Sequence, residues 1–388
     1  MANTLTNLIP DIYAALDVVS RELVGFIPAV ARDSTADRVA LNQTLRIPIA
    51  PSNAAGGNIT PAMSLPSASD QTIGNATLTF TKQRFFPFSW TGEEQKSVDY
   101  GPGFLTLKQY QIAQAIRAAV NEMESDIAVA AYKGASRAYG TAANTPFGTA
   151  GDYSDAAQLR KILDDNGAPL SDRAIILNTT AGANIRAKQA QAYMAGSNDL
   201  QRNGVLMDLA GFMFRESAQV PTVTAGAMAS ATTTAAVLSI GQTVLPLATA
   251  GTGVVAAGDI ITLANDSNKY VVSAVSFAGS NPASGDSITI AAPGLRVAQS
   301  SAARAITVVA TSARNIGFSR NSILLATRLP AVPEGGDLAS DRVTISDPKS
   351  GIALEFAVYP GFRMNVYHVS VCWGVSVIKP EHCAVLLG

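Results

Sequence analysis

The sequence predicts an α+β fold that combines one long helix, an extended β-hairpin arm and an inserted all-β segment. Apolar residues recur at helical spacing between Thr106 and Gly134, and they alternate with polar residues on both sides of a Pro-, Gly- and Ser-rich stretch from Pro51 to Ile73. After Thr224 the pattern changes to short strands separated by turn residues. The other elements are placed around these three.

The expected arm consists of two strands, "TLRIPIA" (44–50) and "NATLTFTKQRFFPFSW" (75–90), which both alternate apolar and polar residues. Pro48 marks the first as an edge strand, because proline has no N–H to donate to a neighbour. A two-stranded hairpin is marginal alone, so we expect the arm to lie on another copy of the protein. A disordered loop is the alternative for residues 51–73.

The longest predicted helix is "TLKQYQIAQAIRAAVNEMESDIAVAAYKG" (106–134). Thr106 and Gln109 have the spacing of a capping box, and Gly134 is suited to end the helix. About 26 residues at 1.5 Å each give a length of about 40 Å, enough for the spine of a flat domain. The apolar stripe that predicts the buried face consists of Ile112, Ile116, Val120, Met123 and Ile127.

A short amphipathic helix is expected near the N-terminus, with Pro10 at its first position and Gly25 and Pro28 after its end. The same segment lacks the basic and apolar regions of a secretory signal. Residues 151–223 predict a compact α/β region. Its expected elements are a helix over 154–165, a strand over 173–178, a helix over 180–193 with Thr179 or Thr180 as N-cap, and a strand within 210–223.

The segment after Thr224 reads as a β unit inserted into the rest of the fold. Lys and Arg are absent from Thr222 to Ser267, and five strands are expected: "AVLSI" (236–240), "DIITLA" (259–264), "KYVVSAVS" (269–276), "DSITIAA" (286–292) and "AITVVA" (305–310). After Arg314 the mixed character returns, with strands expected in 315–330, 351–359 and 365–378. Sequence on the two sides of the insertion is therefore expected to belong to one body.

Composition narrows the function classes. The chain has 388 residues, of which 47% are hydrophobic and 15% charged, and its net charge is −1. Affinity for nucleic acid through phosphate neutralisation needs a surplus of Lys and Arg, so only a contact without sequence specificity stays open. The two cysteines do not form a disulfide framework and suit a reducing compartment. No apolar run reaches the roughly 18 residues that span a bilayer.

Few residues suggest chemistry. His368, Cys372, His382 and Cys383 could supply a thiol nucleophile or a metal site, against the simpler interpretation of ordinary strand and tail residues. "GTGVVAAG" (251–258) imitates a dinucleotide-binding loop, but its glycine spacing is wrong and it leads into a strand. We therefore predict no catalytic residue, no cofactor and no metal.

Two charged clusters have both a structural and a functional interpretation. Asp337, Asp341 and Asp347 could hold calcium, although an exposed loop with turn-forming aspartates is the simpler prediction. The second cluster follows the arm and is predicted to be a solvated loop, with an intersubunit salt-bridge site as the alternative. Its members are Glu93, Glu94, Lys96 and Asp99.

The order of these parts resembles the major capsid (coat) proteins of tailed bacteriophages, which share the Johnson fold, and in particular the short-tailed-phage type with an inserted β domain. "VVAAGDIITLANDSNKYVVSAV" looks like the core of that inserted domain. "NIGFSRNSILLATRLP" and "CWGVSVIKPEHCAVLLG" look like the segments after the insertion. The resemblance covers nearly the whole chain.

The resemblance implies a shell protein that assembles as hexamers and pentamers into an icosahedral virion capsid around double-stranded DNA, formed in the host cytoplasm. It also implies a scaffolding protein, a portal and non-specific contact with the packaged DNA. The implied division is an N-terminal helix and arm (1–42), an extended β-hairpin arm (43–102), a peripheral domain with the spine helix (103–150), an axial α/β domain (151–223), an inserted β domain (224–312) and returning C-terminal strands (313–388).

The subunit interface is expected to involve Arg46, Lys82, Arg84, Glu93 and Glu94, on and after the arm. Two other functions stay open on the sequence alone. A nanocompartment shell of the encapsulin type would share the fold and enclose cargo enzymes. A β-rich surface adhesin is suggested by the Thr- and Ala-rich insertion, although the expected spine helix and missing export signal disfavour it.

Overall fold

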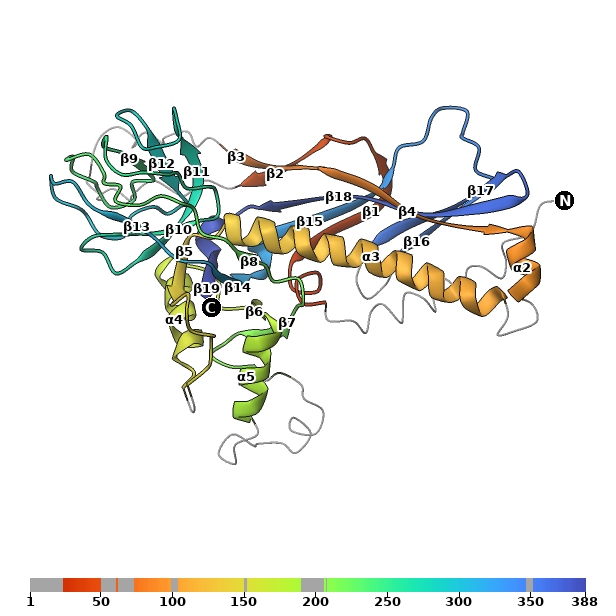
Figure 1. Ribbon diagram of the computed structural model, residues 1–388, viewed down its shortest axis with the longest axis horizontal. Helices are drawn as coiled ribbons and strands as arrows, with labels where there is room; N and C mark the ends of the chain where they lie inside the picture. Colours follow the sequence, from red (N-terminus) through yellow and green to blue (C-terminus); the bar gives the residue numbers. More distant parts are fainter. Residues whose placement is uncertain are drawn as a thin grey trace.

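The fold is elongated, with one long helix lying along a sheet of long strands. The computed structural model describes residues 24–49, 61, 73–98, 104–149, 152–189, 206, 208–346 and 352–388. In Figure 1 the long helix α3 runs below the long strands, the β-rich insertion lies at one end, and α4 and α5 lie below that end. The expected N-terminal helix over Pro10 to Leu23 lies outside the described residues. The α+β class is confirmed.

Helix α3 (Phe104–Lys133) is the predicted spine. Its stripe is buried, with Ile112, Met123 and Ile127 fully covered, so the helical period correctly identified the face that packs on the sheet. The expected capping box is wrong, because the helix begins at Phe104 and Thr106 already lies in its first turn. No described helix is long and apolar enough to cross a membrane.

The sheet above α3 is built around one 14-residue strand, β18, in the order β1-β15-β18-β17-β16, with β4 also paired to β18. The first half of β18 lies between β17 and β4, and its last residues pair with β15. The strands are β1 (Ala31–Val39), β4 (Lys82–Thr91), β15 (Ile323–Pro330), β16 (Asp341–Ser346), β17 (Ala353–Gly361) and β18 (Met364–Val377).

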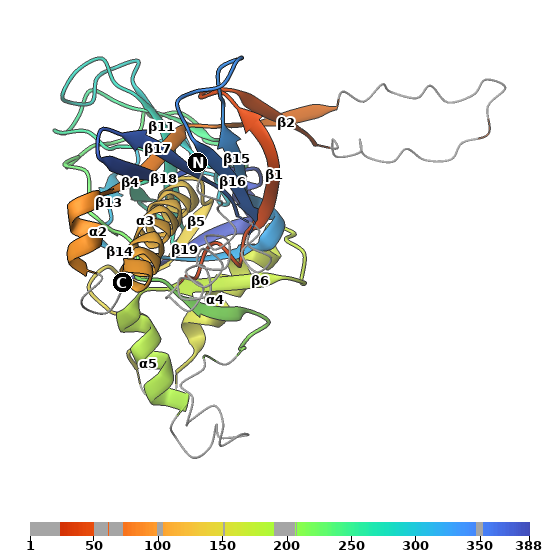
Figure 2. The same ribbon diagram turned by 90° about the vertical axis from the view of Figure 1, so that its right-hand side faces the viewer.

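The predicted arm is a separate two-stranded sheet of β2 (Thr44–Ile49) and β3 (Gly74–Thr79). Figure 2 shows the two strands extending from the body to one side. The single strand expected over 75–90 is instead two, because the chain turns at Phe80 and Thr81 and continues as β4 in the body sheet. The described part of the arm packs on the body, where Leu78 and Phe80 are buried with Ala326 and Cys372, and Leu45 and Ile47 pack against the same cluster.

The second sheet joins the α/β region to the inserted strands, in the order β13-β10-β11-β5-β19-β14-β6-β7. Its strands outside the insertion are β5 (Arg137–Gly140), β6 (Arg173–Leu177), β7 (Met213–Glu216), β8 (Thr222–Val223), β14 (Ser312–Ser319) and β19 (Cys383–Leu387). Strand β8, at the start of the insertion, pairs with β14 at its end. The division into domains stays a prediction.

Two helices cover the α/β region. Helix α4 (Ser154–Asp165) has the predicted bounds, and Gly167 follows it with a positive φ of 73°. Helix α5 (Thr179–Gln189) begins as expected, but its N-cap is Asn178, whose Oδ1 accepts the N–H of Ala181 at 2.9 Å. A short asparagine side chain reaches this amide more directly than Thr179 or Thr180, which already lie inside the helix.

The inserted strands are β9 (Val244–Pro246), β10 (Ile260–Leu263), β11 (Lys269–Ser276), β12 (Ser287–Ile290) and β13 (Ile306–Val308). Four of the five predicted strands are confirmed within one or two residues. The fifth, "AVLSI", is wrong, since only Leu238 forms a bridge there and the strand lies at Val244–Pro246, where pairing with β12 is available. The segment 251–258 leads into β10 and not into a helix, so the dinucleotide loop is correctly discounted.

Candidate functional site

Lys82 and Arg84 lie on β4 and form ion pairs within the same chain. The Lys82 Nζ lies 2.9 Å from Glu122 Oε1 and 2.8 Å from Asp126 Oδ1, both on α3. The Arg84 Nε lies 3.1 Å from the same Glu122 oxygen. These ion pairs attach β4, the strand that follows the arm, to the spine helix α3. Whether either residue also contacts a second subunit stays a prediction.

The charges in this cluster stabilise one another. Partial burial lowers the pKa of Lys82, but the hydrogen-bonded carboxylates of Asp126 and Glu122 outweigh it and raise that pKa overall. Burial likewise raises the pKa of Glu122, and Lys82 and Arg84 outweigh it and lower that pKa overall. Trp373 completes the cluster by donating its Nε1–H to Asp126 at 2.9 Å. Lys82 and Glu122 therefore each favour the ionised form of the other.

Arg46 lies on the arm and its side chain is exposed. Apolar surface is exposed at the outer end of the described arm. Ile73, just before β3, is 69% exposed there. Backbone contact at the base is close, because a Cβ on Gly374 would lie 2.2 Å from the Thr79 carbonyl oxygen. The described strands of the arm therefore pack on the body and leave Ile73 exposed at their outer end.

Glu93 and Glu94 lie in a helix that the sequence analysis missed, α2 (Gly92–Val98). The N–H of Thr91 donates to Glu94 Oε2 at 2.9 Å, and the N–H of Glu94 donates to Thr91 Oγ1 at 3.2 Å. This is a capping box, and the letters "TGEE" contain its signature. The expected solvated loop is wrong here. Glu93 is exposed in the first turn, and its expected role in a subunit contact stays a prediction.

A recess of about 710 Å³ lies beside α2, at the end of the spine away from the insertion. It is formed where the N–H of Gly92 donates to the Arg363 carbonyl at 3.1 Å, which ties α2 to the β17–β18 turn. Phe362, in this turn, is 92% exposed. Leu338, which shortly precedes β16 in the sequence, is 88% exposed. Both apolar side chains are therefore open to solvent in the isolated subunit.

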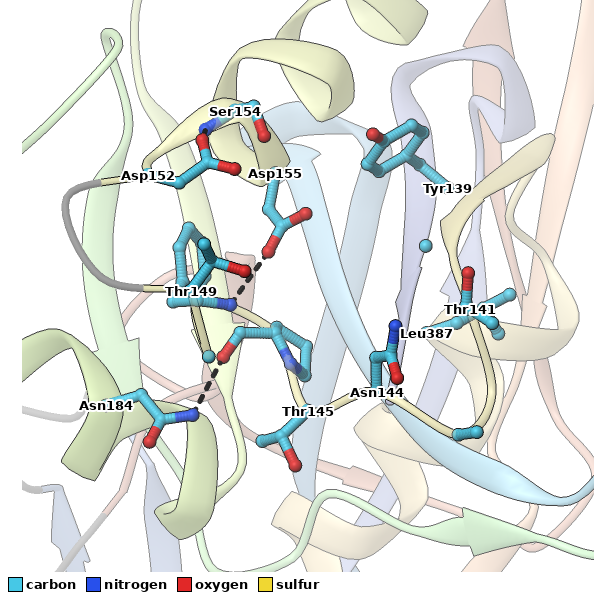
Figure 3. A pocket seen from close by; sticks show the side chains of 15 residues that line it. Tyr139, Thr141, Asn144, Thr145, Thr149, Asp152, Ser154, Asp155, Asn184 and Leu387 are labelled. Carbon is cyan, nitrogen blue, oxygen red and sulfur yellow. Dashed lines mark hydrogen bonds between the residues drawn. The ribbon is translucent and has the colours of Figure 1, made fainter.

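A polar pocket of about 640 Å³ lies between β5 and α4 (Figure 3). Its labelled side chains mostly carry hydroxyl, amide and carboxylate groups. Three of them form hydrogen bonds with the backbone. Asp155 accepts the N–H of Phe147 at 2.7 Å, Asp152 accepts the N–H of Ser154 at 2.7 Å, and Asn184 donates to the Pro146 carbonyl at 3.1 Å. The described residues lining this pocket include neither a histidine nor a cysteine, and its carboxylates, Asp152 and Asp155, already accept backbone N–H groups.

The thiols are unsuited to nucleophilic catalysis. Burial raises the pKa of Cys372 to about 11 and that of Cys383 to about 12, whereas a reactive cysteine has a lowered pKa. Cys383 lies within 3.1 Å of Ser322 Oγ, and His368 packs between the rings of Phe85 and Tyr359 at 4.9 and 4.8 Å. These contacts fit the structural interpretation of the four residues.

The described aspartates of the cluster considered for calcium accept hydrogen bonds from other groups of the same chain. Asp337 accepts hydrogen bonds from the Ala339 N–H, the Tyr359 hydroxyl and Arg342, the last at 2.6 Å. Asp341 accepts the N–H of Arg342, and Asp347 lies outside the described residues. Within the described ranges no group of three His, Cys, Asp or Glu side chains could hold a metal ion.

Comparison with known proteins gives structural likeness only. No protein-family model matches the chain, and neither does any curated protein sequence. The chain is similar to one from the capsid structure of the cyanophage P-SCSP1u, with 9% identity, a TM-score of 0.49 and coverage of 92% of this chain and 86% of that one. It is also similar to a chain of Mycobacterium phage Che8, with 12% identity, a TM-score of 0.45 and coverage of 89% and 84%.

A third similar chain comes from the crystal structure of a virus-like particle from Pyrococcus furiosus. It has 9% identity and a TM-score of 0.44, with 98% of this chain and 100% of that one covered. Because all three TM-scores lie below 0.5, the likenesses assign neither a family nor a function to this chain.

Proposed function

We propose that this chain is a major capsid protein that self-assembles into a closed shell. The observation that carries the proposal is the arm: β2 and β3 form a sheet of their own that pairs with no other described strand and extends from the body. A two-stranded sheet is marginal in water, so its outer part requires a surface to lie on, and a second copy of the chain supplies one in a closed assembly.

The flat body supports the same proposal. A 30-residue helix lies along one face of the long-stranded sheet, and β4 bonds to it through Lys82, which gives an elongated, flat unit suited to tiling. Apolar side chains are exposed at its far end, at Phe362 and Leu338. Obligate subunits keep such surface for their neighbours.

The finer parts of the proposal follow from the sequence resemblance. We infer hexamers and pentamers in an icosahedral shell around double-stranded DNA, a scaffolding protein and a portal as partners, assembly in the host cytoplasm, and a structural role without catalysis. The low net charge of −1 fits a wall that touches DNA without binding it tightly. A nanocompartment would share the subunit and differ in its contents.

The test is negative-stain electron microscopy of the full-length chain, expressed with and without its scaffolding partner and fractionated by size. We expect closed shells of uniform diameter. Nucleic acid inside them would support the capsid, and packaged protein would favour the nanocompartment. A stable monomer under every condition would contradict both.

The arm is tested by Ile73→Asp, matched with Leu170→Asp in the loop after α4, because both side chains are 69% exposed. We expect folded subunits from both variants and shells only from the second, since a charge on the arm must be desolvated against a neighbour. Shells from Ile73→Asp in normal yield would contradict the role of the arm. So would loss of shells from both variants, because the arm would then have no special part.

A further inference from the structure

The insertion is attached to the α/β region over very short stretches of strand. Strand β11 pairs with β5 at two positions, Lys269 with Ala138 and Tyr270 with Arg137, and β8 pairs with β14 at two more. Two neighbouring residue pairs span only about 3.3 Å along a strand. Such a contact fixes where the insertion is attached, but it restrains weakly the angle at which the insertion stands. A side-chain contact away from the paired backbone is needed to set that angle.

Arg137, the first residue of β5, has a side chain in the position to make this contact. It is only 4% exposed, and it lies where the insertion meets helix α4, at the same end of the molecule in Figure 1. A guanidinium group carries five N–H donors in a rigid planar fork. A buried group of this kind requires several acceptors, and the acceptors of Arg137 come from two different parts of the fold.

The insertion supplies one amide oxygen. Nη1 of Arg137 donates to Asn268 Oδ1 at 3.2 Å, in the turn 264–268 between β10 and β11. The amide of Asn268 is oriented by Asp266, whose Oδ1 accepts both Asn268 Nδ2 at 2.7 Å and the Asn268 N–H at 2.8 Å. Asp266 is held in turn by the Tyr270 hydroxyl, which donates to its Oδ2 at 2.7 Å. Because the NH₂ group of Asn268 is bound to Asp266, its oxygen is directed at Arg137.

Helix α4 supplies acceptors on the other side. Nη2 of Arg137 donates to the Ile162 carbonyl and to Asn166 Oδ1, each at 3.3 Å, and lies 3.5 Å from Asp165 Oδ2. Asn166 is also oriented by its own NH₂ group, which donates to the Glu381 carbonyl at 2.8 Å. The C-terminal end of a helix carries partial negative charge, which further favours a cation at this point.

One rigid guanidinium therefore binds two asparagines that are each oriented independently. A rotation of the insertion relative to α4 would break the hydrogen bond to Asn268 or those to the end of α4, because the fork cannot follow both. Loss of a partner by a buried charged group costs its desolvation free energy. The arrangement thus opposes a change of angle in either direction.

We propose that Arg137 is a positioning residue that sets the orientation of the insertion relative to α4, by binding the turn 264–268 and the C-terminal end of that helix at the same time. The short strand pairing determines the point of attachment, and Arg137 determines the angle. The proposal concerns the isolated subunit, so it does not depend on the proposed function in a shell.

The experiment measures the distance distribution between two spin labels by pulsed electron paramagnetic resonance, on the full-length, unassembled chain. The labels are attached to Val237→Cys in the insertion and Leu170→Cys in the loop after α4, which are 63% and 69% exposed positions. Cys372 and Cys383 are fully covered, and labelling of the chain without the new cysteines checks that they do not react. We expect one narrow distribution. In Arg137→Met we expect a distribution about twice as wide, because only the short strand pairing then restrains the angle.

Two further variants separate the proposed contact from a general loss of packing. Asn268→Ala removes only the acceptor in the insertion, leaves the acceptors on α4 in place, and is expected to widen the distribution to a similar extent. Combined with Arg137→Met it should add nothing, because both substitutions remove one contact. The matched control is Arg160→Met on α4, which loses bonds to Asp164 and the Ala210 carbonyl and should keep the wild-type width. Circular dichroism and size-exclusion chromatography confirm that each variant is folded.

Three results would overturn the proposal. A wild-type width in Asn268→Ala, or in a folded Arg137→Met, would mean that the strand pairing alone sets the angle. Equal widening in Arg160→Met would assign the effect to loosening of α4. Additional widening when Asn268→Ala is added to Arg137→Met would mean that the asparagine acts through another contact.

Discussion

The spine end and the inserted β region use their charged side chains in different ways. At the spine, Lys82, Arg84, Glu122 and Asp126 form a partly exposed cluster of ion pairs between a strand and a helix. The insertion has few charges, and its carboxylates are buried: Asp259, Asp266 and Asp286 are 3%, 9% and 5% exposed. They accept hydrogen bonds from backbone amides and not from Lys or Arg side chains.

The difference teaches how each region is held together. The spine end has a broad apolar core under α3, so its ion pairs add a modest, salt-sensitive increment. The insertion has short strands and long connections, whose buried amides need partners. Its aspartates provide partners for several of these amides. The three predictions below test this contrast.

The largest effect is expected for Asp286→Ala. Its carboxylate accepts the N–H groups of Ala278 at 2.9 Å and Ala283 at 2.8 Å, and truncation would leave both amides without partners. We expect a loss of about 2–4 kcal/mol in the opening free energy of β11 and β12, measured by native-state hydrogen exchange. Glu334→Ala, at an exposed position, is the control and should change it by less than about 0.5 kcal/mol. An equal effect of both substitutions would remove the contrast.

A smaller effect is expected for Lys82→Met, which keeps an apolar side chain of similar length and removes both ion pairs. We expect a loss of about 1 kcal/mol in the free energy of unfolding, because the pairs are partly solvated. Urea denaturation followed by tryptophan fluorescence reports on this site, since Lys82 Nζ lies 5.8 Å from the centre of the Trp373 ring. Lys96→Met on α2 is the control. A cost above about 3 kcal/mol would show that the spine depends on its charges as the insertion does.

The smallest effect is a pH dependence at the spine. The pKa of Glu122 is lowered in the folded state, so its contribution is present above 4.5 and is lost as the pH falls through the folded value. Hydrogen exchange of β4 should therefore increase in acid in the wild type and stay level in Glu122→Gln. The same acid response in both proteins would assign it to other carboxyl groups.

Helices whose apolar spacing and end signals lie within their own sequence were predicted correctly. The apolar stripe identified α3, and α4 was predicted with its bounds because a helix-length pattern ends at Asn166 and Gly167. Strand β1, "ARDSTADRV", has no apolar alternation and forms because it pairs in parallel with β15, some 290 residues later. Such pairing depends on tertiary context, and single-sequence reasoning does not reach it. The capping box before α2 was readable and was overlooked.

The site was less predictable than the fold. Lys82 and Arg84 were expected at a subunit interface, which stays a prediction, and their partners within the chain lie on a helix about 40 residues away and depend on how β4 packs. Arg137 gave no signal, since an arginine usually points to solvent. Its burial follows from acceptors in the insertion and at the end of α4, which the fold brings together.

The sheet that links the insertion to the rest of the chain has a mechanical consequence. β11 continues the central sheet through its pairing with β5, at Lys269 with Ala138 and Tyr270 with Arg137, and the Arg137 side chain reaches Asn268 on one side and α4 on the other. The insertion is thus joined to the α/β region by paired strands and not by a flexible linker. A load applied to the insertion would pass through these two residue pairs to β5 and, through the parallel pairing of β5 with β19, into the α/β region.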